Sequence, residues 1–241
     1  MSDPEQPQPS SIDNDLAVLR DYSAPSDVLL VSFSGLKRHP EKVPDFSFRG
    51  TLRDLPLKKL YLRDLNKAWF LRGLRGMTTD VEQTVAFLRA EAAAAAARRV
   101  VFAGYSFGGF AALLHGLLAG ADEVHAISPQ TFVSFWLRLR CRDHRWQRYV
   151  WKLHFGKARA FHDLRPLLSA PTLTRFHVYF ARDSRLDTCH AAHVRGVPGV
   201  MIHEYAAGSH RLVTALRDSG ELRAIFEKKS HIEKIRRSAD E

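Results

Sequence analysis

The sequence predicts an α/β protein built on a mostly parallel, doubly wound sheet with a helical insertion. Five short apolar runs alternate with helical patterns, which is the order of a parallel sheet with helices on both faces. These runs span residues 28–33, 100–103, 124–127, 176–181 and 200–205. The second run passes through a glycine-framed serine, Ser106, into an apolar helical pattern, which indicates a tight strand-to-helix turn. A length of 241 residues suits one domain of this class.

The remaining elements follow from composition and capping. A helix is expected over residues 78–98, because Thr79 or Asp80 can cap its first turn and an alanine run extends it. A weaker strand is expected at residues 60–62. A closing helix is expected over about residues 211–226.

One domain is expected to span residues 13–227. Residues 1–12 are polar and rich in proline, so they are expected to be disordered, and residues 228–241 form a charged tail. No apolar segment follows the N-terminus, and no run is long enough to span a bilayer. The two cysteines, Cys141 and Cys189, are too few for a disulfide framework, so free thiols and a cytoplasmic location are expected.

The turn at Ser106 has the pattern of a nucleophile. Glycines two residues to either side, Gly104 and Gly108, leave room for a strained serine backbone at the apex. Such a turn lifts the hydroxyl out of the sheet and leaves the Phe107 N–H at a helix start, where negative charge is stabilised. A purely structural turn serine is the alternative, and the flanking strand and helix favour the nucleophile.

A nucleophilic serine needs a histidine to accept its proton and a carboxylate to orient that histidine. His210 follows a small-residue loop after the last expected strand and directly precedes a helix. Asp183 and Asp187 both follow the strand at residues 176–181. Asp183 is preferred as the acid because it lies nearer the strand end, while Asp187 could cap the next helix, or the two roles could be reversed.

Negative charge on the attacked oxygen requires two backbone donors. Phe107 would supply one N–H group. Leu36, which follows the close turn allowed by Gly35 after the first strand, would supply the other. An ordinary strand exit at this position is the alternative.

Residues from about 130 to 168 interrupt the alternation and are expected to form a lid above the carboxyl edge of the sheet. The segment combines tryptophans with many cations. It could be an electropositive mouth for an anionic substrate, a contact with an anionic membrane surface, or a solvated helix that covers the pocket. The residues assigned to substrate or lid contacts are Trp136, Arg138, Arg142 and Trp146. Nucleic-acid binding is not expected despite a net charge of +10, because these cations cluster over the mouth.

Two other polar features are given structural roles. Asp64 is expected to hydrogen-bond the backbone of its own loop. The pattern Cys189-His190-x-x-His193 resembles a metal-binding pair, but no second cluster accompanies it, so no metal is expected.

From about residue 27 to residue 226 the chain resembles an α/β-hydrolase. The resemblance is carried by the serine elbow, by Asp183 or Asp187 as the acid, and by the small-residue loop that ends at His210. Two positions depart from the pattern, since Ser34 stands before Gly35 in place of the familiar histidine, and Phe180 stands where glycine often precedes the acid. The first departure leaves the oxyanion donor open, and the second leaves the acid open.

Shorter stretches resemble bacterial α/β-hydrolase-like proteins, some of which are encoded with polysaccharide and glycosyltransferase functions. These stretches are residues 63–70, 128–131 and 205–216. The triad and the resemblance together predict a serine hydrolase that cleaves an ester or thioester through an acyl-enzyme on Ser106, with no cofactor. An acyltransferase with a sugar or alcohol acceptor and a non-catalytic partner protein are the alternatives. The acyl group and the oligomeric state are not specified by the sequence.

Overall fold

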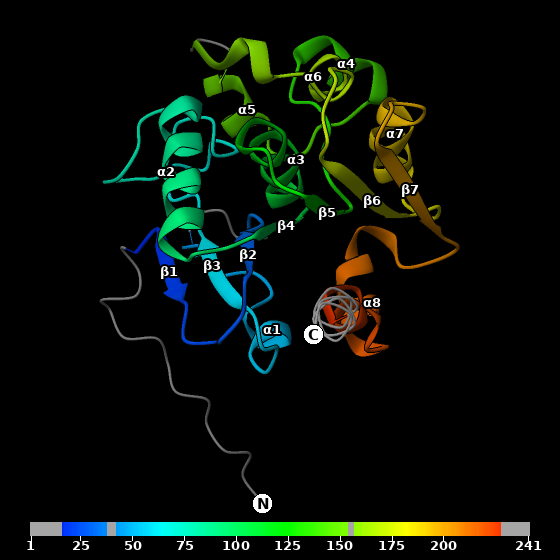
Figure 1. Ribbon diagram of the computed structural model, residues 1–241. Coiled ribbons are helices and arrows are strands. Elements are labelled where there is room, and N and C mark those ends of the chain that lie inside the picture. The colour runs from blue at the N-terminus through cyan, green and yellow to red at the C-terminus, as the bar shows by residue number, and fades with distance from the viewer. Residues whose placement is uncertain (1–15, 38–41, 154–156, 228–241) are drawn as a thin grey trace, which may run out of the picture.

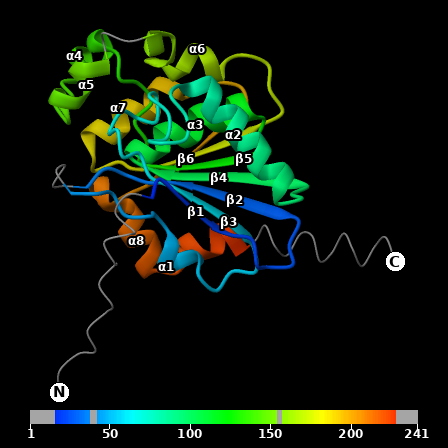
Figure 2. The same ribbon diagram turned by 90° about the vertical axis from the view of Figure 1, so that its left-hand side faces the viewer.

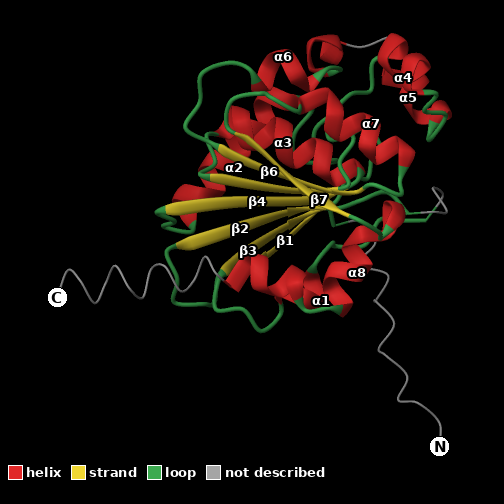
Figure 3. Cartoon of the chain, turned by 90° about the vertical axis from the view of Figure 1, so that its right-hand side faces the viewer, coloured by secondary structure: helices red, strands yellow, loops and turns green. Residues whose placement is uncertain are grey.

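The computed structural model describes residues 16–37, 42–153 and 157–227, and its centre is one seven-stranded sheet (Figure 1). Seen edge on, the sheet has α2, α3, α6 and α7 on one face and α1 and α8 on the other (Figures 2 and 3). This three-layer arrangement confirms the predicted fold class. The predictions of disorder at residues 1–12 and of a charged tail at residues 228–241 lie outside the described residues.

The strands lie in the order β1-β3-β2-β4-β5-β6-β7. All neighbours are parallel except β1 and β3, which are antiparallel. Their bounds are β1 (Val18–Asp21), β2 (Val28–Phe33), β3 (Lys58–Leu62), β4 (Arg99–Tyr105), β5 (Glu123–Ile127), β6 (Arg175–Ala181) and β7 (Val200–Tyr205). The first strand was not predicted, because a four-residue, partly exposed edge strand carries little apolar periodicity.

The helices are mostly short apart from the two that flank the central strands. Their bounds are α1 (Arg49–Leu52), α2 (Val81–Ala94), α3 (Phe107–Ala119), α4 (Phe135–Cys141), α5 (Gln147–Leu153), η2 (Lys157–Phe161), α6 (Leu164–Leu168), α7 (Arg185–Val194), η3 (Ser209–Arg211) and α8 (Leu212–Asp218). Asp80 caps α2 by accepting from the Gln83 N–H. The predicted closing helix is interrupted, because the chain turns at Gly220 (φ 78°) before residues 221–227 become helical again.

Alternation of side chains along β2 shows how the sheet builds two cores. Val28 and Leu30 pack toward α8, whereas Leu29, Val31 and Phe33 pack toward α3. All six residues of the strand are buried, as expected for a parallel strand covered on both faces. None of the helices in the described ranges is long and apolar enough to cross a membrane.

One histidine lies inside the apolar core on the α3 face. His115 is fully buried, and its ring stacks on Phe33 with 5.7 Å between ring centroids. Burial lowers the pKa of His115 from its ordinary value of 6.5 to about 3. The folded protein therefore resists protonation of a group that the unfolded chain protonates readily.

We expect His115→Leu to reduce the acid sensitivity of the fold. A lowered folded-state pKa contributes stability that is present above pH 6.5 and is lost as the pH falls toward 3. Between about pH 7.5 and about pH 5 the wild-type protein should lose about 2 kcal/mol of unfolding free energy through this residue, and the variant should not. Urea unfolding at both pH values measures the difference. An equal loss in both proteins would contradict the assignment.

Candidate active site

Ser106 lies at the junction of β4 and α3 with a strained backbone, φ 53° and ψ −112°. A Cβ atom at Gly104 would overlap the Gly108 carbonyl, and one at Gly108 would overlap the Phe33 carbonyl at the end of β2. A Cβ atom at Gly109 would lie 2.8 Å from Cβ of Pro129. The three glycines are therefore required by close backbone packing around the serine.

Ser106, His210 and Asp187 form one continuous hydrogen-bonded chain. The Ser106 Oγ lies 2.9 Å from Nε2 of His210, which belongs to η3 after the last strand. The other ring nitrogen, Nδ1, lies 2.8 Å and 3.0 Å from the two carboxylate oxygens of Asp187. The Asp187 side chain is fully buried, whereas the His210 side chain is 35% exposed. This geometry connects a hydroxyl, an imidazole and a carboxylate in the order that proton transfer requires.

The preference for Asp183 as the partner of His210 is wrong in this structure. Asp183 accepts hydrogen bonds from the backbone N–H groups of Gly208 (3.2 Å) and Ser209 (2.8 Å). It therefore holds the loop that carries His210 and does not contact the ring. Asp187 reaches the ring because it lies one helical turn further on, in the first turn of α7, where the N-cap residue Ser184 accepts from its N–H.

The two proposed oxyanion donors come from the start of α3 and from the loop that follows β2. Phe107 is the first residue of α3, so its N–H has no acceptor within the helix. In the loop after β2, the Gly35 N–H donates to Ser47 Oγ at 3.1 Å, and Leu36 is the next residue along the chain. The Ser34 and Phe33 carbonyls lie against Gly108, which brings this loop to the elbow. The assignment of the Leu36 N–H stays a prediction.

Asp64 has the structural role expected for it. Its buried carboxylate accepts three backbone N–H groups of its own loop, at 2.9, 2.6 and 2.8 Å. This loop carries Trp69, whose Nε1 donates to Gln130 Oε1 at 2.7 Å and whose ring centroid lies 4.8 Å from that of Phe107. Asp64 thus holds the loop that places Trp69 against Phe107, next to Ser106.

The insertion between β5 and β6 reaches the carboxylate of Asp187. Arg145 belongs to the loop between α4 and α5, and its Nη1 lies 3.4 Å from Asp187 Oδ1. The same guanidinium binds both carboxylate oxygens of Asp143, at 3.0 and 2.8 Å. Nothing in the sequence distinguished Arg145 from its many neighbouring arginines, because only the fold brings it to the triad.

Asp143 and His190 anchor the insertion from the inside. Burial by itself would raise the pKa of Asp143, but hydrogen bonds from His190 (3.1 Å) and Arg145 lower it well below its ordinary value. Burial lowers the pKa of His190 to about 4, although the hydrogen bond to the neighbouring Asp143 acts in the opposite direction and raises it. The Thr131 N–H donates to the other nitrogen of His190 at 3.1 Å. His190, part of the metal-like pattern, is thus held by protein groups on both ring nitrogens.

The four residues assigned to substrate or lid contacts separate into two pairs. Trp136 is 74% exposed and Arg142 is exposed as well. Arg138 is buried, lies 3.6 Å from Asp143 and donates to the Arg145 carbonyl. Trp146 is half-buried and packs against the main core. Arg138 and Trp146 therefore build the insertion from within, and only Trp136 and Arg142 face outward.

The expectation of free thiols is wrong in this structure, which pairs Cys141 with Cys189 as a disulfide with a Cα–Cα distance of 6.3 Å. The bond joins the end of α4 to α7, the helix that carries Asp187. Arg185 adds a second tie by donating to the Cys141 carbonyl at 2.8 Å. Sequence alone could not show that these two cysteines, 48 residues apart, lie close enough to form a bond. The predicted cytoplasmic location stays a prediction.

One group of side chains in the described ranges has metal-ligand chemistry. Atoms of Glu123, His125 and His177 lie within 4.8 Å of one another, in the first half of the neighbouring strands β5 and β6. Glu123 forms ion pairs with Arg99 (2.9 Å) and Arg175 (2.5 Å). The two imidazoles stack with 4.7 Å between centroids and 13° between planes, so their in-plane lone pairs do not converge. Both features favour an ion-paired, stacked cluster over a metal site.

No family model and no curated protein matches the chain. Solved structures similar to it include the capsule O-acetyltransferase of Neisseria meningitidis serogroup A, with 12% identity and a TM-score of 0.63 over 85% of this chain and 89% of that one. A mutant of this acetyltransferase has also been solved in complex with CoA. A glycosylation associate protein complex from Streptococcus agalactiae matches with 15% identity and a TM-score of 0.55, over 88% of this chain and 43% of that one.

A third similar structure is an α/β-hydrolase enzyme from the metagenome of sediments from the lagoon of Mar Chica, Morocco. It has 13% identity and a TM-score of 0.56, over 88% of this chain and 95% of that one. Together with the strand order and the serine elbow, this similarity shows that the chain has the α/β-hydrolase fold. The predicted resemblance is thereby confirmed for the fold. At these identities the similarity specifies no activity.

We expect reduction of the Cys141–Cys189 bond to destabilise the protein by about 2–4 kcal/mol, because the cross-link restricts the unfolded chain. Urea unfolding with and without a thiol reductant measures the change. A variant carrying Cys141→Ser and Cys189→Ser is the control and should be insensitive to the reductant. An unchanged midpoint for the wild-type protein under reduction would contradict the pairing.

Proposed function

We propose that the protein is a serine hydrolase that cleaves an ester or thioester through an acyl-enzyme on Ser106. The observation that carries the proposal is the hydrogen-bonded chain from Ser106 through His210 to Asp187. A structural serine has no need of a strained backbone together with an imidazole at 2.9 Å whose other nitrogen faces a buried carboxylate. The combination supports nucleophilic catalysis.

In the first half-reaction His210 accepts the Ser106 hydroxyl proton while Oγ attacks the substrate carbonyl carbon. The carbonyl oxygen gains negative charge, which the N–H groups of Phe107 and Leu36 stabilise. The intermediate then collapses, and the bond to the leaving group breaks as His210 returns the proton to it. In the second half-reaction water loses a proton to His210 and attacks the acyl carbon. The bond between that carbon and Ser106 Oγ then breaks as His210 returns the proton to Oγ, which releases the acid and restores the serine.

Asp187 orients His210 and stabilises its charged form during both half-reactions. Arg145 lies 3.4 Å from Asp187 Oδ1, the oxygen that also lies 2.8 Å from His210 Nδ1, so it places a positive charge beside that carboxylate. Asp183 acts on the same histidine indirectly, because it binds the backbone of the preceding loop at Gly208 and Ser209. No metal or organic cofactor is needed for this chemistry.

An acyltransferase is the second candidate function, favoured by the similarity to a capsule O-acetyltransferase. Such an enzyme would form the same acyl-enzyme on Ser106 and transfer the acyl group to a sugar or alcohol hydroxyl instead of water. A non-catalytic partner protein is the third candidate, supported by the similarity to a glycosylation associate protein complex. The hydrogen-bonded triad counts against it.

We expect a fluorophosphonate probe to label the wild-type protein at Ser106, because the probe reacts with serines activated by a histidine. Ser106→Ala should abolish labelling. Asp187→Asn should slow it about 10⁴-fold, since the histidine loses its orienting charge. Asp183→Asn, the matched control, should slow it about tenfold at most, because this residue holds only the loop backbone. Mass spectrometry locates the label, and gel fluorescence follows its rate.

The labelling experiment has two outcomes that contradict the proposal. A folded wild-type protein that stays unlabelled would remove the nucleophile. If the probe labelled the Asp187→Asn variant faster than the Asp183→Asn variant, the assignment of the acid would be reversed. Circular dichroism of each variant shows whether the fold is retained.

Product analysis separates hydrolysis from transfer. With an activated ester and a hydroxyl acceptor, we expect free acid as the main product, and Ser106→Ala should remove the activity. A new ester that accumulates in proportion to acceptor concentration would instead establish the acyltransferase. A wild-type rate on a panel of esters that equals the rate of Ser106→Ala would favour the non-catalytic partner protein.

A further inference from the structure

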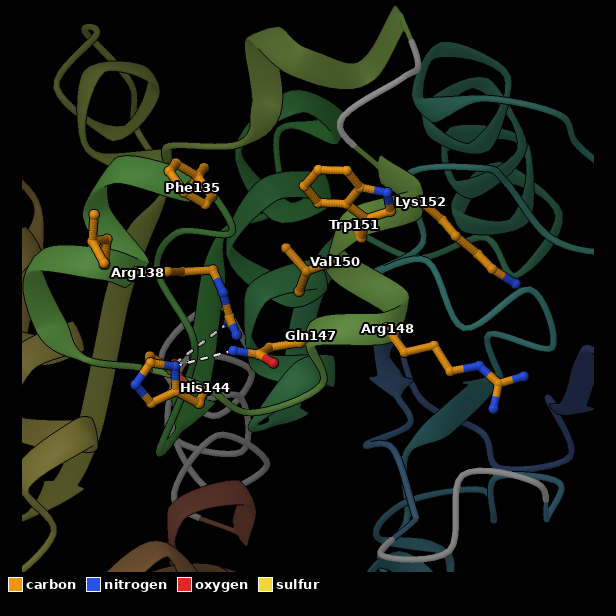
Figure 4. A pocket seen from close by; sticks show the side chains of 10 residues that line it. Phe135, Arg138, His144, Gln147, Arg148, Val150, Trp151 and Lys152 are labelled. Atoms are coloured by element: carbon orange, nitrogen blue, oxygen red, sulfur yellow. Dashed lines mark hydrogen bonds and ion pairs between the residues drawn. The ribbon is translucent and has the colours of Figure 1, made fainter.

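The helices α4 and α5 of the insertion enclose a groove of about 580 Å³ on its outer side (Figure 4). Phe135 and Leu139 line it from α4, and Val150 and Trp151 line it from α5. In Figure 4 the side chains of Phe135 and Trp151 lie across the groove from one another. Ser106 is not among the lining residues, so this groove is separate from the elbow.

Three large apolar side chains that line the groove are exposed to solvent, and so is Trp136, whose ring centroid lies 5.2 Å from that of Phe135. Trp136 is 74% exposed, Trp151 61%, Leu139 54% and Phe135 47%. They come from two adjacent short helices, so they form one group and are not scattered over the molecule. Contiguous exposed apolar surface of this kind marks an interaction site in a stable protein.

The exposed charges of the same segment are all positive. Between residues 134 and 153 the exposed cations are Arg140, Arg142, Arg148 and Lys152. The segment has a single acid, Asp143, which is buried and bound to Arg145. Arg148 and Lys152 extend from α5 beside the groove (Figure 4). No exposed carboxylate of this segment offsets their charge.

We propose that this surface docks on an anionic lipid bilayer. It is defined by the apolar residues Phe135, Trp136, Leu139 and Trp151 and the cations Arg140, Arg142, Arg148 and Lys152, and is called the basic aromatic surface below. Tryptophan favours the boundary between headgroups and acyl chains, and arginine and lysine reach anionic headgroups with their charged ends. Docking of this kind lies in the membrane plane and requires no spanning helix.

The charge pattern selects a bilayer over two other partners. A second copy of the chain would place the same cations opposite each other, which opposes self-association. A soluble polyanion would match the cations but leave the tryptophans in water. An anionic bilayer satisfies both kinds of side chain at once. The proposal is independent of the proposed function, since it involves no residue of the triad.

Co-sedimentation with vesicles of phosphatidylcholine, with and without phosphatidylglycerol, tests the proposal. We expect binding only to the vesicles that contain phosphatidylglycerol, and weaker binding as salt is added, because the attraction is screened. Bound protein should also show a blue shift of tryptophan fluorescence, since Trp136 and Trp151 leave water. Full-length wild-type protein is used throughout.

Two sets of variants separate the contributions. Replacing Arg140, Arg148 and Lys152 together by Ala should lower the partition coefficient about 100-fold, at about fivefold per cation. Trp136→Ala combined with Leu139→Ala should lower it about tenfold. The matched control replaces Arg53, Arg98 and Arg217, which are exposed on other parts of the molecule, by Ala. It removes the same net charge and should leave binding within about twofold of wild type.

Three results would overturn the proposal. One is the absence of binding to phosphatidylglycerol vesicles at low salt. Another is an equal loss of binding in the control variant, which would reduce the effect to net charge. The third is a concentration-dependent dimer that Trp136→Ala with Leu139→Ala disrupts, without vesicle binding, which would make the surface an interface between two copies. Unchanged circular dichroism in each variant excludes unfolding as the cause.

Discussion

The strained backbone at Ser106 is the constraint around which the carboxyl edge of the sheet is arranged. Gly108 packs against the end of β2, and Gly109 packs against Pro129, which follows β5. The exits of three neighbouring strands, β2, β4 and β5, therefore meet at one turn. Any side chain larger than hydrogen at these glycines would separate the strand exits, so the position of the serine and the packing of the edge depend on each other.

Two carboxylates that follow β6 position His210 in different ways. Asp183 binds the backbone ahead of His210, and Asp187 binds its ring. The division follows from local structure, because Asp183 precedes the cap of α7 whereas Asp187 lies inside its first turn. Because Asp183 holds the loop and Asp187 holds the ring, the imidazole of His210 stays between Asp187 and Ser106 with little freedom to rotate.

The insertion is coupled to this arrangement at several points. Arg145 contacts Asp187, the Cys141–Cys189 bond joins α4 to α7, and Arg185 donates to the end of α4. Its inner side is thus a network of buried ion pairs and hydrogen bonds, while its outer side exposes apolar and cationic side chains. The inner side contacts Asp187, the carboxylate bound to His210, and the outer side is exposed to solvent.

The sequence by itself determined the class of fold, the glycine-framed turn at Ser106 and the position of His210 after the last strand, because each depends on local periodicity and on chain order. It did not determine which acid contacts the histidine. Asp183 and Asp187 are only four residues apart in the chain, and where each side chain points depends on how α7 packs. The contact of Arg145 with Asp187 and the proximity of Cys141 to Cys189 could not be predicted from the sequence either. Both depend on contacts between segments more than 40 residues apart in the chain, and only the tertiary structure brings such segments together.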